Sequence, residues 1–421
     1  MSRNQISAVF NVTEIANPIK LFDNSNTKIL SLIKTFEIDG ERITEPSEYF
    51  TFDKEGLHTV SIQLDLGLES MSNLFLDCYY LQEVDFSELD TSKVTTLSEL
   101  FKRCTSLTSV EFGKMDTSNV TDMQKMFIGC TNLLSLDLSN FNTSKVTDMN
   151  NMFSACSSLK NLDLSNFDTS KVKNMNSMFC ACAKLTQIDL STFNTENVTD
   201  INCMFYGCEK LESLDLSNFE TKNVEDMHGL FAHCKKLSFL YVTNFNTKKV
   251  KHMQYMFDSC NSLVFLDLSS FCTDSVEDMK FMFFECWSLT SLDLSMFNIG
   301  NVKNLRNMFH GCNSLVMLDL SNFGENLATD IEFMFCDCSS LINVDLGNFN
   351  SKGVKDVSHM FGGCEKLNNI DMGKFDMTKL ENCEGMFDKI PEEGSIIYND
   401  TFSEELVRLV PGGWEKLCIK K

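Results

Sequence analysis

Apolar residues recur along most of the chain in a pattern with two halves. In the stretch 120–143 the first half places apolar side chains at Val120, Met123, Met126, Phe127 and Cys130. Steps of three and four residues are typical of a short amphipathic helix. In the second half leucines at 136 and 138 alternate with polar residues, which is typical of a strand with one buried face. We therefore expect a short helix followed by a short strand.

This pattern repeats every 26 residues without insertion. In the chain of 421 residues a Phe stands at each step from 75 to 387, and a Cys follows three residues later at each step from 78 to 364. One copy cannot bury its apolar face alone, so successive copies must stack. A helix and a Leu-x-x-Leu-x-Leu strand in each copy predict an α/β fold, a leucine-rich-repeat solenoid of about 13 coils over residues 67–390.

Stacking turns each repeated residue into a column, and we interpret the Phe and Cys columns as structural core. They include Phe127, Phe153, Phe179, Cys130, Cys156 and Cys182. A spacing of 26 does not match the ligand spacing of zinc or iron–sulfur sites, so no metal site is predicted. The cysteines are expected to be small buried thiols that donate weakly to the backbone, because disulfides would require an oxidising compartment.

Both ends of the chain lack the repeat and are predicted to cap the solenoid. Residues 1–66 alternate in polarity and contain Asp39–Gly40, a hairpin turn signal, so we expect a small β cap there. Residues 391–421 carry a strand pattern near 394–398 and a helical pattern over 402–410, which together predict an α/β cap.

The middle outward position of the predicted strands forms an acidic row. Its members include Asp137, Asp163, Asp189, Asp215, Asp267 and Asp293. Carboxylates about 5 Å apart repel by roughly 1 kcal/mol even in water, so the row needs compensation. Calcium, hydrogen bonds from neighbouring serines, and lysines in flanking columns are the three sources that we consider, and no other cofactor is expected. The row either binds a basic partner or divalent ions, or it keeps the sheet soluble and caps local backbone.

One copy departs from this row and introduces aromatic side chains. Phe239 and Tyr241 take outward strand positions, and Phe265 takes the position of Phe239 in the next copy. Exposed aromatic residues beside charge are common binding anchors. The alternative is a single repeat that has drifted from the consensus.

Composition narrows the classes of function. The chain has 59 acidic and 36 basic side chains and a net charge of -23, which argues against a nucleic-acid or anionic-membrane partner. It has no apolar run long enough to span a membrane and no visible secretory signal. A nucleophile–base set, a Gly-rich phosphate loop and a metal-ligand cluster are all missing from the sequence pattern, so we do not expect an enzyme.

The copy at 141–167 reads Phe-Asn-Thr-Ser-Lys-Val-Thr-Asp-Met-Asn-Asn-Met-Phe-Ser-Ala-Cys-Ser-Ser-Leu-Lys-Asn-Leu-Asp-Leu-Ser-Asn-Phe. It closely resembles the repeat of the BspA-like leucine-rich-repeat family, and the resemblance covers about residues 68–390. Many members of that family are surface or secreted proteins implicated in adhesion. The resemblance therefore implies an adhesin-like or receptor-like role at the cell surface and supplies no catalytic residues. The absence of a visible signal peptide or wall anchor leaves an intracellular or assembly-bound location open.

Two functions follow from these observations. The first is a non-enzymatic protein–protein interaction module that presents an elongated acidic sheet to a protein partner. The alternative is a structural component of a larger assembly, intracellular or virion-like, that uses the solenoid as a rigid spacer. The sequence does not predict the oligomeric state.

Overall fold

The computed structural model describes residues 4–15, 17–25, 28–324 and 326–420. Over this part of the chain the repeats form a β-solenoid of about 12 turns with coils of about 26 residues, and a β-sheet caps its N-terminal end. The chain divides into two compact units. Unit 1 comprises Met1–Val198 and Met204–Leu211, and unit 2 comprises Thr199–Cys203 and Glu212–Lys421.

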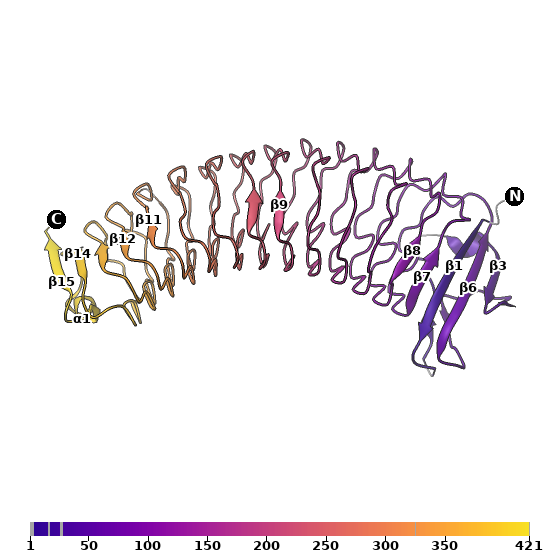
Figure 1. The fold of residues 1–421 in the computed structure, drawn as a ribbon, viewed down its shortest axis with the longest axis horizontal. Helices are drawn as coiled ribbons and strands as arrows, with labels where there is room; N and C mark the ends of the chain where they lie inside the picture. Colours follow the sequence, from indigo (N-terminus) through magenta and orange to yellow (C-terminus); the bar gives the residue numbers. More distant parts are fainter. Residues whose placement is uncertain (1–3, 16, 26–27, 325, 421) are drawn as a thin grey trace. The chain divides into compact units, whose positions relative to one another are not determined.

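The N-terminal cap lies in unit 1 and confirms the predicted β structure. Its six-stranded sheet has the order β4-β3-β6-β1-β7-β8 (Figure 1). The strands of this sheet are β1 (Gln5–Val12), β3 (Ile33–Ile38), β4 (Glu41–Arg42), β6 (Gly56–Leu64), β7 (Leu81–Asp85) and β8 (Ser109–Glu111). The cap also holds the 3-10 turn η1 (Ile29–Ser31) and the small antiparallel pair β2 (Ile19–Lys20) and β5 (Tyr49–Phe50). Because β1 pairs with β7, the first solenoid strand is covered by the cap.

The predicted hairpin at Asp39–Gly40 is confirmed. Strands β3 and β4 pair antiparallel across it, with Ile38 opposite Glu41. Asp39 and Gly40 have φ values of 53° and 81°, the left-handed pair that a two-residue hairpin turn requires.

Unit 2 contains two groups of parallel strands. In the first, β9 (Ser213–Asp215) pairs with β10 (Phe239–Tyr241). The second is a sheet of β11 (Met317–Leu318), β12 (Asn343–Asp345), β13 (Asn369–Asp371), β14 (Ser395–Asn399) and β15 (Glu415–Ile419), which follow one another in that order (Figure 1). Helix α1 (Glu404–Leu409) lies in the chain between β14 and β15 and is capped by the Ser403 hydroxyl. The C-terminal strand and helix therefore occur where the sequence predicts them.

The prediction of a short helix in each coil is wrong. Among the described residues α1 is the one α-helix, and the Met-Phe segments of the coils are consecutive turns. Two residues in each of these segments have left-handed backbone, as Lys125 (φ 54°) and Gly129 (φ 78°) illustrate. An α-helix needs negative φ at every residue, so two left-handed residues four positions apart exclude it.

Hydrogen bonds between coils replace the helical ones. The N–H groups of Lys125, Phe127 and Gly129 donate over 2.8–2.9 Å to the carbonyls 25 residues later, those of Asn150, Met152 and Ser154. Other amides close three-residue turns within the coil, as when Cys130 N–H donates to Phe127 C=O over 3.0 Å. These turns bury every third residue, and this spacing is also found on the buried face of a short helix.

The strand predicted in each coil is present in part. Three-residue strands occur in β8, β9, β10, β12 and β13, and β11 has two residues. The corresponding stretches 135–137, 161–163, 187–189, 265–267 and 291–293 are not strands. The turn segments, rather than the strands, therefore carry much of the bonding between coils.

The repeated aromatic residues fill the centre of each coil. Phe127 and Phe153 stack at 5.8 Å between ring centroids, and Phe153 and Phe179 stack at 5.8 Å as well. These three side chains are fully buried, as are Cys130, Cys156 and Cys182. Burial of side chains of this size supplies the main driving force for stacking the coils.

Candidate binding face and side-chain ladders

The acidic row lies on the exposed surface and each of its carboxylates caps a turn. In unit 1 the Oδ1 atoms of Asp137, Asp163 and Asp189 accept hydrogen bonds of 2.9–3.0 Å from the N–H groups two residues later, in Ser139, Ser165 and Ser191. In unit 2 the same bond, 2.9–3.0 Å long, links Asp215, Asp267 and Asp293 to Ser217, Ser269 and Ser295. Turns of this kind are a common use of Asp side chains.

At Asp137 and Asp163 these hydrogen bonds also stabilise the charged form of the carboxylate. The Ser139 hydroxyl and N–H hold the pKa of Asp137 below its ordinary value. The N–H and hydroxyl of Ser165 do the same for Asp163, against repulsion from the neighbouring row members. Serine is therefore one source of the compensation that the row requires.

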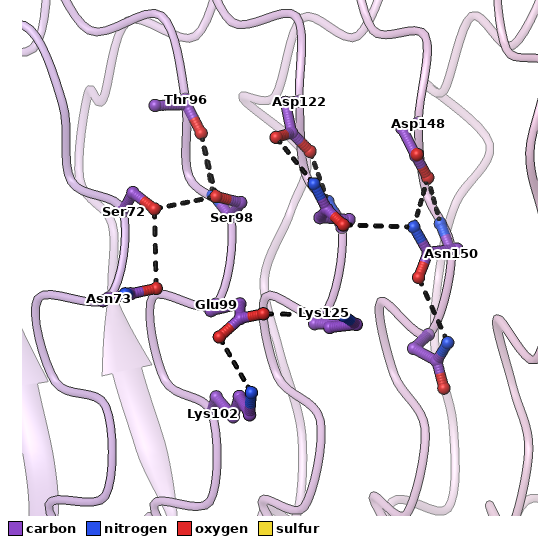
Figure 2. A network of polar contacts seen from close by, with 12 residues as sticks. Ser72, Asn73, Thr96, Ser98, Glu99, Lys102, Asp122, Lys125, Asp148 and Asn150 are labelled. Atoms are coloured by element: carbon purple, nitrogen blue, oxygen red, sulfur yellow. Dashed lines mark hydrogen bonds and ion pairs between the residues drawn. The ribbon is translucent and has the colours of Figure 1, made fainter. Parts of the chain in front are cut away.

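A second column of acidic and amide residues caps another turn. Figure 2 shows Asp122 and Asp148 at equivalent positions of neighbouring coils, each bonded to the residue two positions later. Asp122 accepts from the N–H of Gln124 over 3.0 Å, and Asp148 accepts from that of Asn150 over 2.9 Å. In the same view Glu99 lies 2.9 Å from the Nζ atom of Lys102 and 3.5 Å from that of Lys125.

The aromatic residues that interrupt the acidic row lie in unit 2, on the side of the coils formed by the strand segments. Phe239 and Tyr241 are 62% and 52% exposed, and Phe265 is 67% exposed. The parallel register of β9 and β10 places Tyr241 beside Asp215 of the acidic row. Phe265 occupies the position of Phe239 in the following coil.

Other apolar residues of unit 2 are exposed at equivalent coil positions, with Thr290 and Ser291 in the coil between Phe265 and Met317. Val264 is 50% exposed and Met317 is 66% exposed, and Val316 beside it is exposed too. All occur seven or eight residues after the repeated Phe, the coil positions at or next to that of Phe239. Reading those two positions across all copies would have found them in the sequence. We call Phe239, Tyr241, Val264, Phe265, Val316 and Met317 the apolar face.

The repeated cysteines form a ladder of hydrogen bonds inside the coils. The Sγ atoms of Cys130, Cys156 and Cys182 donate over 3.1–3.3 Å to the carbonyls of Phe101, Phe127 and Phe153, each 29 residues earlier. Burial raises the pKa of Cys182 to about 12, so this thiol is protonated at neutral pH. No disulfide joins any of the cysteines that the structure describes.

One protein family matches most of the chain. The family described as "Mycoplasma protein of unknown function, DUF285" matches residues 69–187, 129–241, 233–340 and 316–395. These matches overlap and together cover the solenoid repeats. The chain belongs to the DUF285 family.

Comparisons with individual proteins add little to the DUF285 assignment. No curated protein matches the sequence. Among solved structures, "Functional domain of InlJ from Listeria monocytogenes includes a cysteine ladder" is 16% identical over 80% of this chain and 73% of that one, with a TM-score of 0.19. "Crystal structure of TLR13-ssRNA13 complex" is 10% identical over 84% of this chain and 73% of that one, with a TM-score of 0.16.

The turn side of this DUF285 chain carries a feature that the sequence pattern did not reveal. In unit 2, ring contacts run through consecutive coils: Tyr255 stacks on Phe281 at 4.9 Å, Phe284 stacks on His310 at 4.9 Å, and Phe333 stacks on His359 at 4.8 Å. Arg306 lies over the Phe333 ring at 5.9 Å. The sequence does hold a sign of these ring contacts, because aromatic residues and histidines replace small or polar residues at positions near the repeated Phe.

None of the helices that the structure describes in this DUF285 chain has the length and hydropathy needed to cross a membrane.

Proposed function

We propose that the chain is a non-enzymatic protein–protein interaction module whose apolar face, flanked by the acidic row, binds a protein partner. The observation that carries the proposal is the exposure of Phe239, Tyr241 and Phe265 on one side of unit 2. Large aromatic side chains at the centre of an interface contribute much of its binding energy. Leaving them in water costs free energy that a partner would recover on binding.

The surrounding charge specifies the kind of partner. Asp215 and Asp293 beside the apolar face are exposed and Asp267 is half-buried, and each carboxylate accepts a hydrogen bond from the N–H of the serine two residues later. A partner that complements this surface has apolar side chains at its centre and Lys or Arg at its rim. Such rim charges mainly accelerate association and select the partner.

The proposal also includes the role of the module in the cell. The resemblance of the 26-residue unit to the BspA-like repeat supports an adhesin-like or receptor-like surface protein. The alternative is a rigid spacer in a larger assembly, which would contact its neighbours through the caps rather than through the apolar face.

Site-specific photo-cross-linking in the native source material distinguishes these roles. We expect a photoreactive phenylalanine analogue at position 265 to link the chain to a protein partner. The same analogue in place of Tyr79, an exposed aromatic residue of unit 1, is the matched control and should not capture that partner. The same analogue at Leu57 and Leu417, exposed residues of the two caps, tests the alternative. Links from these positions to neighbours of fixed stoichiometry, with none from position 265, would support the spacer role and contradict the binding-face proposal.

Binding of the captured partner can then be measured with purified variants. The double substitution Phe239→Ser and Phe265→Ser should weaken binding by about thirtyfold or more, because a hot-spot residue contributes about 2 kcal/mol. Asp215→Lys with Asp267→Lys should also weaken binding, mainly by slowing association. Tyr79→Ser should leave the affinity unchanged. Equal affinities for all variants would exclude this face.

A further inference from the structure

Three metal-binding side chains meet on the turn side of unit 2. His310, Cys336 and Asp337 each place one ligand atom within 4.8 Å of the other two. Cys336 Sγ lies 3.7 Å from Asp337 Oδ2, and His310 Nε2 lies 3.8 Å from the same oxygen. A tetrahedral zinc ion with bonds of about 2.0–2.3 Å separates its ligand atoms by about 3.3–3.6 Å. Shifts of a few tenths of an ångström would therefore bring the Asp337 distances to zinc-site values.

The position of His310 is fixed by packing, while its imidazole makes no hydrogen bond to any residue that the structure describes. Its ring stacks on Phe284 at 4.9 Å and contacts Phe333 at 6.1 Å. Its Nδ1 atom is buried and has no hydrogen-bond partner among the described residues. Its Nε2 atom faces Asp337 at a distance too long for a hydrogen bond. The Nε2 atom is therefore the ring nitrogen that is open to a ligand shared with Asp337, and the Nδ1 atom lies on the opposite side of the ring and outside this cluster.

Neighbouring coils keep the other two side chains in place. The N–H of Gly311, next to His310, donates to Cys336 C=O over 2.8 Å, which sets the register of the two coils. In the following coil Gly363 leaves room for the Asp337 carboxylate, because a Cβ at that position would collide with Asp337 Oδ1. The site is thus built from three coils whose spacing is set by backbone hydrogen bonds.

We propose that His310, Cys336 and Asp337 form a zinc site with three protein ligands. The imidazole supplies a nitrogen ligand and the thiolate supplies a sulfur ligand, and both favour zinc. Calcium and magnesium prefer oxygen ligands alone. The Asp337 side chain is 62% exposed, so a fourth coordination position faces solvent and can hold water. Bound zinc would connect the coil of His310 to the next coil and stabilise the folded state of unit 2 in proportion to its occupancy.

Cobalt titration of the full, reduced chain tests the site. Co²⁺ is the probe because a Co²⁺–thiolate bond gives an ultraviolet charge-transfer band and tetrahedral Co²⁺ gives visible bands. We expect these bands to saturate near one equivalent and to be removed by Zn²⁺. Cys336→Ser should abolish the thiolate band, and His310→Gln and Asp337→Asn should each weaken Co²⁺ binding by more than about tenfold.

Cys180→Ser is the matched control, because Cys180 follows the repeated Phe179 as Cys336 follows Phe335 but has Ser154 and Tyr206 at the same position of the adjacent coils. This variant should bind Co²⁺ as the unmodified chain does. The proposal is overturned if the unmodified chain shows no thiolate band, or if the band persists in Cys336→Ser. Asp337→Asn changes an exposed side chain and should fold normally, so unchanged Co²⁺ affinity in that variant would also overturn the three-ligand site.

Discussion

At the scale of single residues, a column of buried threonines joins neighbouring coils. The Thr143 hydroxyl donates to the Asp168 carbonyl over 2.9 Å and accepts from the Asp168 N–H over 2.8 Å. One side chain therefore satisfies both backbone groups of a residue in the next coil. Equivalent bonds are made by Thr91, Thr117, Thr169, Thr221, Thr247 and Thr273.

Substitution at this column tests how much these bonds contribute. Thr143→Val keeps the shape of the side chain but leaves the two Asp168 backbone groups without that partner, so we expect it to lower the free energy of unfolding by about 1–3 kcal/mol. Thr143→Ser retains the hydroxyl and should be much less destabilising, since Ser351 makes the equivalent bond to Asp376 C=O. Urea denaturation measures the difference. Equal stability of the two variants would show that the hydroxyl contributes little.

At the scale of elements, the turn segment of each coil has backbone that no helix tolerates. Ala155 has a φ of 59°, and its N–H donates to Cys180 C=O in the next coil over 2.7 Å. The equivalent positions in other coils include Gly129, Gly207 and Gly311. An L-residue in the left-handed region costs roughly 1–2 kcal/mol, so the hydrogen bonds between coils must offset that cost.

A glycine substitution distinguishes a turn from a helix, because it changes the free energy of unfolding in opposite directions in the two structures. Ala155→Gly should leave the free energy of unfolding unchanged or raise it by up to about 1 kcal/mol, because relief of left-handed strain outweighs the added freedom of the unfolded chain. In a helix the same change would lower it by about 1 kcal/mol. Ala232→Gly is the control, because Ala232 is buried and is not left-handed, and it should be destabilising. Destabilisation by Ala155→Gly would contradict the turn assignment.

At the scale of the whole molecule, the net charge of -23 includes rows of aspartates that recur at equivalent positions of the coils. Exposed carboxylates at equivalent coil positions repel one another, and hydrogen bonds from serine hydroxyls and backbone N–H groups oppose that repulsion. Hydroxyl and backbone donors from Ser269 lower the pKa of Asp267, and those from Ser295 lower that of Asp293. The donors therefore outweigh the repulsion at these positions.

The pH dependence of stability follows from the direction of these shifts. An Asp whose folded pKa lies below its ordinary value of 3.8 stabilises the fold above that value, and this stabilisation is lost as the pH falls through the folded pKa. We expect the melting temperature to fall as the pH is lowered from about 5 to about 2, measured by circular dichroism. A rise over the same interval would show that repulsion within the rows is the larger effect. Added salt at neutral pH should raise the melting temperature by screening the rows.

Several features of the fold and of the candidate binding face could be predicted from the sequence because they depend on the period alone. A 26-residue repeat of buried Phe and Cys requires stacked coils. An outward position occupied by Asp, with Phe239, Tyr241 and Phe265 breaking the pattern, remains outward in any such stack. The N-terminal β cap and its hairpin followed from alternation and from the turn residues Asp39 and Gly40.

Only the tertiary structure decided between helix and turn, because both bury residues at steps of about three. The amides of Lys125 and Phe127 find their acceptors 25 residues later, and nothing within one coil shows that these partners are available. The same reason hid the cluster of His310 with Cys336 and Asp337, whose spacing matches no local ligand motif. The period determined that coils stack, and contacts between the stacked coils determined how each coil folds and which side chains meet.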